Sequence, residues 1–322
     1  MAGRIVKMSV AALCWAIPCC HAADAYPVKP IRFIIPFAPG GGNDLVARVI
    51  AQHLTEAWNF QVIADNRAGG GGTVGTQTAA TAAPDGYTLL LGYTGTLAIN
   101  PGLYPNIPYD PIKDFSPVAM AAGTALVAVV HPGVPATTTQ ELIAYAKSKP
   151  GVLNFASGGT GTGSHMAGEM FKAMAGVNMV LVPYKGTGPA IVELIAGQTQ
   201  LMFSVLPGAV PHINTKRLRA IGVTSRRRSA LMPELPTIAE SGLKGYEAVL
   251  RYGILVPRGT PAPIIAKLGA EVIKIMARND VITLLASSGA EPLPGNAVEY
   301  AKVIASELAA WRQVIKTAGI RP

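Results

Sequence analysis

Cysteine is scarce in this 322-residue sequence, and its few copies all lie near the N-terminus. Arg4 and Lys7 precede an apolar run over residues 8–17, and alanines follow at positions 22, 23 and 25, which is the layout of a secretory signal peptide. We therefore expect residues 1–23 to be a signal peptide that directs export to the periplasm. The three cysteines are Cys14, Cys19 and Cys20. Since all of them lie in this segment, thiol catalysis, disulfide bonds and cysteine metal sites are excluded for the exported chain.

The rest of the sequence also lacks long apolar runs and strong charge. Nothing after the first segment reaches the roughly 18 consecutive apolar residues that a membrane-spanning helix needs. Charged residues make up 14% of the chain, and the formal net charge of +9 favours anionic ligands without identifying one. The one basic run, Arg226 to Arg228, has no interleaved aromatic residues. We interpret it as a solvated loop and expect no nucleic-acid partner.

Signatures of catalysis and of cofactor binding are missing as well. The sequence has no G-x-S-x-G elbow and no phosphate-binding G-x-x-x-x-G-K-[ST] loop, and its histidines are too far apart for a local metal site. Residues 70–75 match G-x-G-x-x-G, but the next strand does not end in the acidic residue that would hold a ribose. A dinucleotide site is therefore not supported. We expect no enzymatic activity, no cofactor and no bound metal.

The sequence does contain a series of short apolar segments that alternate with helical patterns. Such segments predict parallel sheets covered by helices on both faces, which is the doubly wound α/β class. A proline-rich segment over residues 100–117 indicates a surface connection near a boundary. We expect two lobes, residues 24–124 with 248–322 and residues 125–247. The expected strands cover residues 31–35, 61–64, 87–93, 125–130, 152–156, 179–184, 201–206, 219–223 and 252–256.

The first expected strand leads into a glycine-rich loop and then a helix. Pro36 ends the strand, Gly40 to Gly42 form the loop, and Asn43 is the expected helix cap, with Asp44 in the first turn. This series presents backbone N–H groups and the positive end of the helix dipole, which suits a carboxylate or a phosphate. The alternative is a tight turn that needs glycine for its geometry alone.

A second loop of this kind covers residues 157–164, SGGTGTGS, after the expected strand 152–156 and before a helix. Its hydroxyl and backbone N–H groups can donate several hydrogen bonds without a fixed positive charge. His165 lies in the first turn of the helix and is either a site residue or a structural one. Two such loops in two lobes favour a ligand at the carboxyl ends of the strands, where open α/β sheets bind.

Ordered stretches along most of the chain match the pattern of a known family. They include YPVKPIRFIIPFAPGGGNDLVAR, DNRAGGGGTVGT, PDGYTLLLG, NFASGGTGTGSHMAGEMF, VPYKGTGPAIVELIAGQ and LPTIAESG. The sequence thereby resembles the Bug, or TctC-like, solute-binding proteins of tripartite tricarboxylate transporters. The resemblance implies a two-lobed periplasmic protein of the type II, or Venus-flytrap, fold that closes on a small organic acid and delivers it to a membrane permease. We expect it to act as a monomer. The site residues that the resemblance implies are Phe37, Ala38, Gly41, Asn43, Asp44, Thr94, Ser157, Thr160, Gly161, His165 and Tyr184.

Two positions depart from the pattern of this family. Ser204 stands where aspartate is usual and Arg251 where tryptophan is usual, and we expect both changes to make the protein locally more positive. Near the end of its strand, Ser204 would remove the repulsion between an aspartate and a second ligand carboxylate. This favours a di- or tricarboxylate, or an aromatic acid without an amine, over an amino acid such as aspartate or glutamate, and it adds Ser204 to the expected site. Alternatively, Ser204 points into the lobe and touches no ligand.

Two other functions stay open on the sequence alone. The first is a ligand-sensing protein of the same flytrap fold, whose closed form binds a signalling partner instead of a permease. An exported α/β hydrolase is the further alternative, with Ser157 and His165 as its candidate nucleophile and base.

Overall fold

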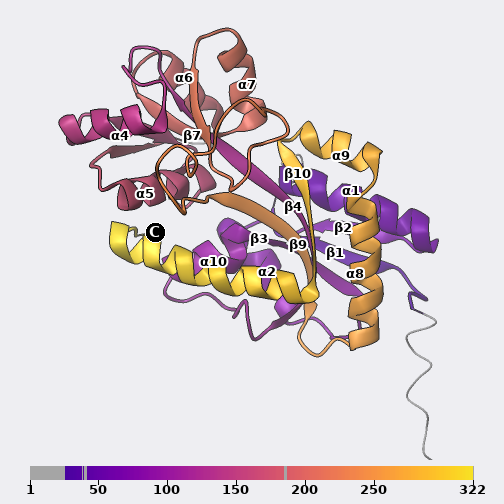
Figure 1. The fold of residues 1–322 in the computed structure, drawn as a ribbon. Coiled ribbons are helices and arrows are strands. Elements are labelled where there is room, and N and C mark those ends of the chain that lie inside the picture. Colours follow the sequence, from indigo (N-terminus) through magenta and orange to yellow (C-terminus); the bar gives the residue numbers. More distant parts are fainter. Residues whose placement is uncertain (1–25, 38, 40–41, 185–186, 322) are drawn as a thin grey trace, which may run out of the picture.

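The computed structural model describes residues 26–37, 39, 42–184 and 187–321. Within these ranges ten strands form one continuous sheet with the order β2-β1-β3-β9-β4-β7-β5-β6, and β8 and β10 join it by pairing with β4. Figure 1 shows two groups of helices, one around each half of the sheet. In the part of the chain so described, no helix combines the length and the apolar character needed to span a membrane.

The first half of the sheet is built on three parallel strands, with β1 (Ile31–Ile35) between β2 (Val62–Asn66) and β3 (Thr88–Tyr93). Its apolar residues are buried because α1 and α8 cover one face and α2 and α10 cover the other. The helices of this half are α1 (Gly42–Trp58), α2 (Thr73–Ala80), α8 (Ala262–Met276), α9 (Asn279–Ala286) and α10 (Ala297–Ala318), with the short turns η1 (Gly70–Gly72), η2 (Gly95–Ile99) and α3 (Asn100–Leu103).

Two long strands, β4 (Phe115–Val130) and β9 (Val249–Pro257), connect the halves. They pair antiparallel from Phe115↔Pro257 to Ala125↔Val249. The first part of β4 also pairs with β10 (Ala290–Asn296), and its second part pairs with β7 and β8. The chain therefore crosses between the halves as hydrogen-bonded strands (Figure 1).

The second half repeats the parallel arrangement with β5 (Asn154–Ser157) between β6 (Val180–Pro183) and β7 (Leu201–Val205). Its other elements are β8 (Arg219–Val223), α4 (Thr139–Ser148), α5 (Gly163–Ala175), α6 (Thr187–Ile195) and α7 (Leu206–Asn214). A capping box starts α4, because the Thr138 hydroxyl accepts from the Glu141 N–H and the Glu141 carboxylate accepts from the Thr138 N–H.

The nine expected strands are all present, and the α/β class is confirmed, but three details differ. β4 begins at Phe115, ten residues before the expected start at Ala125. The sequence prediction missed this first part because its alanines have a low strand propensity. β10 was not expected, since Pro292 and Pro294 argue against a central strand; it pairs on one side only, with β4. The sheet contains the expected parallel strands but is mixed, since β4, β8, β9 and β10 pair antiparallel.

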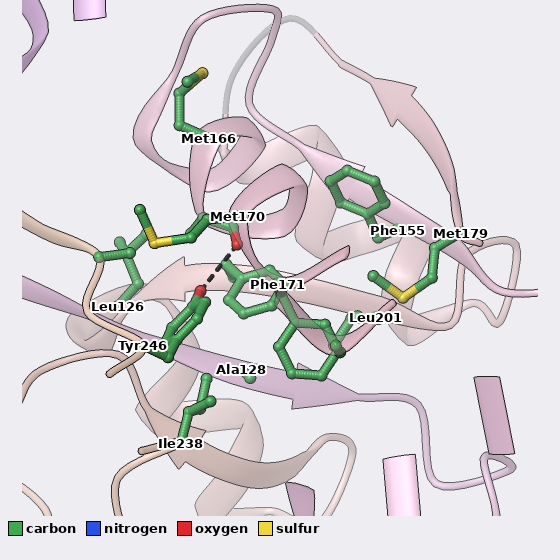
Figure 2. Packing of buried hydrophobic residues seen from close by; sticks show 14 of the residues in the cluster. Leu126, Ala128, Phe155, Met166, Met170, Phe171, Met179, Leu201, Ile238 and Tyr246 are labelled. Carbon is green, nitrogen blue, oxygen red and sulfur yellow. Dashed lines mark hydrogen bonds between the residues drawn. The ribbon is translucent and has the colours of Figure 1, made fainter. Parts of the chain in front are cut away.

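An aromatic cluster forms the core of the second half (Figure 2). The ring of Phe171 lies 5.7 Å from that of Phe203 and 6.1 Å from that of Tyr246, measured between centroids. The buried Tyr246 hydroxyl donates a hydrogen bond of 2.8 Å to the Ala167 carbonyl in α5. Trp311 of α10 belongs to the same cluster, so the C-terminal helix packs against both halves.

Replacing Tyr246 by phenylalanine should lower the free energy of unfolding by about 1 kcal/mol, because one buried hydrogen bond is lost and no side-chain polar atom is left unpaired. Tyr246→Ala should lower it by about 3–5 kcal/mol, because a cavity adds to the lost burial. Urea titration followed by circular dichroism measures both values. Equal losses in the two variants would contradict this assignment of the core.

Candidate functional site

The carboxyl ends of the parallel strands bring expected site residues together in two groups. In the first half, Phe37 follows β1 and Thr94 follows β3. In the second half, Ser157 ends β5, Tyr184 follows β6 and Ser204 lies near the end of β7. Neighbouring parallel strands end at one edge of a sheet, so the residues of each group are close to one another.

The second glycine loop reaches the first half of the molecule. A Cβ atom added at Gly161 would lie 3.0 Å from Leu103 Cδ2 in α3, and one added at Gly163 would lie 2.6 Å from Leu250 Cδ1 in β9. Gly161 also has a left-handed backbone, with φ +76°. Glycine is therefore favoured at 161 by its conformation and by the close approach. This loop lies at the boundary between the two halves.

Asp44, in the first turn of α1, is held by hydrogen bonds to protein atoms. Its buried carboxylate accepts from Arg48 Nε and from Asn66 Nδ2, both at 2.9 Å. Asn66 Nδ2 also donates to the Phe37 carbonyl at 3.0 Å. Asn66 thereby links Asp44 of α1 to Phe37 at the end of β1.

The other residues expected in this loop are Ala38, Gly41 and Asn43. Asn43 is half-buried in the first turn of α1, which begins at Gly42, so it is not the cap that the sequence predicts. Ala38 and Gly41 lie outside the described residues, and their part in a site stays a prediction.

Three aromatic rings, Phe37, Tyr93 and Tyr252, form an aromatic wall where β1 and β3 end. Phe37 meets Tyr93 edge-on with ring centroids 5.4 Å apart, and Tyr93 stacks on Tyr252 at 5.3 Å. Gly72 lies against this wall, since an added Cβ would be 3.2 Å from Phe37 Cζ. Sequence reasoning missed the tyrosines and Gly72. Two signals would have found them: aromatic residues beside Thr94 and Arg251, and the run of four glycines at 69–72.

Most hydroxyl groups of the second loop bond to the loop itself. Ser157 Oγ accepts from the Gly159 N–H at 3.2 Å, and Thr162 Oγ1 donates to the carbonyl oxygen of the same glycine at 2.7 Å. Ser164 Oγ accepts from another loop amide at 2.9 Å. Thr160 is exposed, and its hydroxyl has no hydrogen-bond partner within the described ranges. It is therefore the loop hydroxyl best placed to meet a ligand.

The first turn of α5 adds backbone donors at the same place. Thr162 caps this helix by accepting from the His165 N–H at 3.4 Å. Among the residues that the structure describes, no group accepts a hydrogen bond from the N–H of Gly163 or Ser164. The positive end of the helix dipole coincides with these donors, so this end of α5 suits an anionic group.

His165 supports the loop in its neutral form. Its side chain is buried, and Nδ1 accepts from the Gly161 N–H at 2.9 Å. Burial, with a smaller effect of Lys172, lowers the pKa of His165 to about 4. The other ring nitrogen lies 4.0 Å from Glu169 Oε1, and Glu169 is paired with Lys172 at 2.8 Å. At neutral pH His165 is therefore an uncharged acceptor that holds Gly161 in place.

Tyr184 and Ser204 occupy different surroundings at the edge of the second half. The Tyr184 N–H donates to the Ser157 carbonyl at 2.9 Å, which joins the exits of β6 and β5. Ser204 is 1% exposed, and its hydroxyl donates to the Val205 carbonyl at 3.2 Å. In this structure the hydroxyl faces its own strand inside the lobe, and a role of Ser204 in ligand choice stays a prediction.

Thr94 and Arg251 belong to one polar cluster with Glu247 and Glu307. The Arg251 guanidinium group donates to both carboxylates. Its backbone N–H donates to Thr94 Oγ1 at 2.9 Å, and Thr94 Oγ1 donates to Glu307 at 3.0 Å. The expectation that Arg251 makes the protein locally more positive was therefore wrong, because two glutamates neutralise it. The Thr94 hydroxyl faces α10 in this arrangement.

The assembled groups are hydrogen-bond donors and aromatic faces. Ser157 and His165, the candidate nucleophile and base of a hydrolase, each bond to the loop backbone and not to one another. In the described part of the chain, no group of three or more His, Cys, Asp or Glu side chains could hold a metal ion. The geometry is suited to reversible binding of a small anion.

Comparisons with known proteins agree with this geometry. Residues 46–320 match the model of a family described as tripartite tricarboxylate transporter family receptor. The chain is 36% identical to protein BugT of Bordetella pertussis (strain Tohama I) over 300 residues, which are 93% of this chain and 92% of that protein. It is also similar to two solved structures from Rhodopseudomonas palustris. The structure of Rpa4515 with adipate has a TM-score of 0.77 and 34% identity, covering 92% of this chain and 99% of that chain. The structure of MatC with bound malate has a TM-score of 0.73 and 33% identity, covering 90% and 100%.

His165→Gln should make the free energy of unfolding less dependent on pH. The pKa of His165 is about 4 in the folded protein, whereas that of an unfolded histidine is about 6.5. Between these values the unfolded chain binds a proton that the folded chain does not, so wild-type stability falls as the pH drops from about 6.5 to about 4. At about pH 4.5 the loss should reach about 2 to 3 kcal/mol. Urea titrations at this pH and at neutral pH measure the difference.

The matched control is His212→Gln, at a half-buried position near the end of α7. The change in its free energy of unfolding between the two pH values should equal that of the wild type. If His165→Gln also followed the wild type, His165 would not be the neutral acceptor described above.

Proposed function

Because this chain belongs to the tripartite tricarboxylate transporter family of receptors, we propose that it is an extracytoplasmic solute-binding protein that captures a small organic carboxylate between two lobes. It holds the acid in the periplasm and delivers it to the membrane permease of such a transporter, acting as a monomer. The observation that carries the proposal is the first turn of α5. Backbone donors, the helix dipole and the exposed Thr160 hydroxyl meet there at the boundary with the first half of the molecule.

A carboxylate is the ligand class that this end of α5 favours. A carboxylate accepts hydrogen bonds from several N–H groups at once and is stabilised by the helix dipole. His165 is neutral at neutral pH and Lys172 is paired with Glu169, so neither adds a free positive charge beside the second loop. The solved relatives contain adipate and malate, which are both dicarboxylic acids. We extend this class to the present chain without choosing the length of the acid.

Two lobes are proposed around this site, residues 24–124 with 248–322 and residues 125–247. In support, β4 and β9 cross between the halves of the sheet, and their pairing reaches Ala125↔Val249, next to the proposed boundaries. A ligand that touches both lobes is bound most fully when they are closed, so binding shifts the population toward the closed form.

The proposed site residues fall into two kinds. Asp44 bonds to Arg48 and Asn66, and His165 bonds to Gly161 of its own loop. Thr160 and Phe37 offer a free hydroxyl and an aromatic face. Contacts with the acid come mainly from the backbone of both loops. The proposed set is Phe37, Ala38, Gly41, Asn43, Asp44, Thr94, Ser157, Thr160, Gly161, His165, Tyr184 and Ser204.

Thermal stability should report the ligand class. At about a hundred times its dissociation constant, an acid adds about 2.7 kcal/mol, and each kcal/mol raises the midpoint of a protein of this size by about 2–4 °C. At least one acid among succinate, malate, adipate and citrate should therefore raise the midpoint by about 5 to 10 °C. Scanning fluorimetry measures the shift. A shift with glucose or a nucleotide, and none with the acids, would contradict the carboxylate assignment.

Gly161→Ala tests whether the second loop holds the acid, and Gly176→Ala at the other end of α5 is its matched control. Both glycines have left-handed backbones, with φ +76° and +61°, so alanine strains both. Only at 161 would the new methyl group meet Leu103, since nothing lies within 4 Å of a Cβ at 176. Gly161→Ala should lose the shift caused by the acid, and Gly176→Ala should keep it. Equal shifts would mean that this loop is not the site.

A further inference from the structure

The cluster of Thr94, Glu247, Arg251 and Glu307 lies where the crossing strand β9 begins. The Arg251 side chain is 15% exposed, and those of Glu247 and Glu307 are 19% and 12% exposed. Charges at this depth are costly unless they are paired and hydrogen-bonded. One arginine donates to both glutamates here, and among the described residues Glu307 pairs with no other cation. The buried Glu307 carboxylate is therefore paired only while Arg251 holds its position.

The hydrogen bonds of this cluster join segments that are distant in the sequence. Arg251 is held by its guanidinium group and also by its backbone N–H, which donates to Thr94 Oγ1 at 2.9 Å. Thr94 donates in turn to Glu307 of α10 at 3.0 Å. The end of β3, the start of β9 and α10 are thereby fixed to one another. A planar guanidinium group presents donors in several directions, whereas the ammonium group of lysine is a single point charge.

The aromatic wall of Phe37, Tyr93 and Tyr252 is attached to this cluster. Tyr93 directly precedes Thr94, and Tyr252 directly follows Arg251. The rings of the two tyrosines stack with centroids 5.3 Å apart, and Phe37 packs against Tyr93 at 5.4 Å. A displacement of Arg251 or Thr94 therefore moves the wall on which Phe37 rests.

We propose that Arg251 is a positioning residue for ligand binding. By bridging Glu247 and Glu307 it holds Tyr93 and Tyr252, and through them Phe37, in the arrangement that meets the acid. This inference rests on the proposed function, since the acid is the ligand proposed above. Arg251 acts through geometry, because its charge is neutralised by the two glutamates. A role in attracting the acid would survive replacement by lysine, whereas the positioning role would not.

The same cluster borders a cavity that contains a natural fluorescent reporter. The cavity has a volume of about 600 Å³, and its walls include Met170 and Met174 of α5 and Trp311 of α10. The chain has three tryptophans, of which Trp15 lies in the expected signal peptide. Replacing Trp58 by phenylalanine in the exported chain thus leaves Trp311 as the only tryptophan. Because α5 also carries the second glycine loop, Trp311 emission reports changes between the lobes.

The test is Arg251→Lys in the exported chain with Trp58→Phe, titrated with adipate and with malate by calorimetry. The dissociation constant should rise about tenfold, mainly through faster dissociation. The change in Trp311 emission on binding should become smaller. Backbone amide exchange over residues 93–96 should be faster than in the parent protein, with or without acid.

Arg226→Lys is the matched control. Arg226 also pairs with Glu247, at 2.9 Å, and also lines the cavity, but its side chain is 81% exposed. An exposed pair of this kind contributes little, so its dissociation constant should stay within about twofold of the parent value. Amide exchange over residues 93–96 should not change.

An unchanged dissociation constant in Arg251→Lys would overturn the proposal, whatever the exchange shows. An equal rise in Arg226→Lys would overturn it as well, because the effect would then not depend on the buried bridge that Arg251 makes. If the parent protein bound neither adipate nor malate, the proposed ligand class would fail. Amide exchange alone would then decide whether Arg251 positions the aromatic wall. Faster exchange over residues 93–96 in Arg251→Lys only would support the positioning role, and unchanged exchange would refute it.

Discussion

The antiparallel pairing of β4 with β9, from Phe115↔Pro257 to Ala125↔Val249, is the interaction on which the rest of the structure depends. β3 is hydrogen-bonded to β9 and β7 to β4, so the parallel strands of both halves are placed relative to this pair. A slip of one residue would turn every side chain of a strand to the opposite face. The pairing also keeps the second glycine loop within reach of the first half, where Gly161 approaches Leu103.

The carboxyl ends of the parallel strands, where the ligand is proposed to bind, are polar but carry few unpaired charges. Asp44 is bonded to Arg48 and Asn66, and Glu169 is paired with Lys172. Most hydroxyls of the second loop are bonded to the loop as well. The groups left for a ligand are backbone N–H groups, the Thr160 hydroxyl and aromatic faces. Such a set recognises a carboxylate by the directions of its hydrogen bonds and by the helix dipole.

Nine strands and the capping box of α4 could be predicted because they depend on local patterns of apolar and capping residues. β10 escaped prediction because Pro292 and Pro294 lie within it. Roles of single side chains were harder to predict, since Asp44 depends on Asn66, 22 residues away, and Arg251 depends on Glu307, 56 residues away. These pairs exist only in the folded chain. The sequence therefore predicted a locally more positive protein at Arg251, where the folded chain pairs the arginine with Glu247 and Glu307.

Binding of a carboxylate at the N-terminus of α5 is the central claim, and an NMR titration tests it most directly. The exported chain would be labelled with ¹⁵N-glycine and titrated with adipate or malate. We predict that the amide resonances of Gly161 and Gly163 move as the acid is added, while that of Gly176, at the far end of the same helix, stays in place. Unmoved resonances at 161 and 163, at saturation with an acid that raises the thermal midpoint, would contradict the claim.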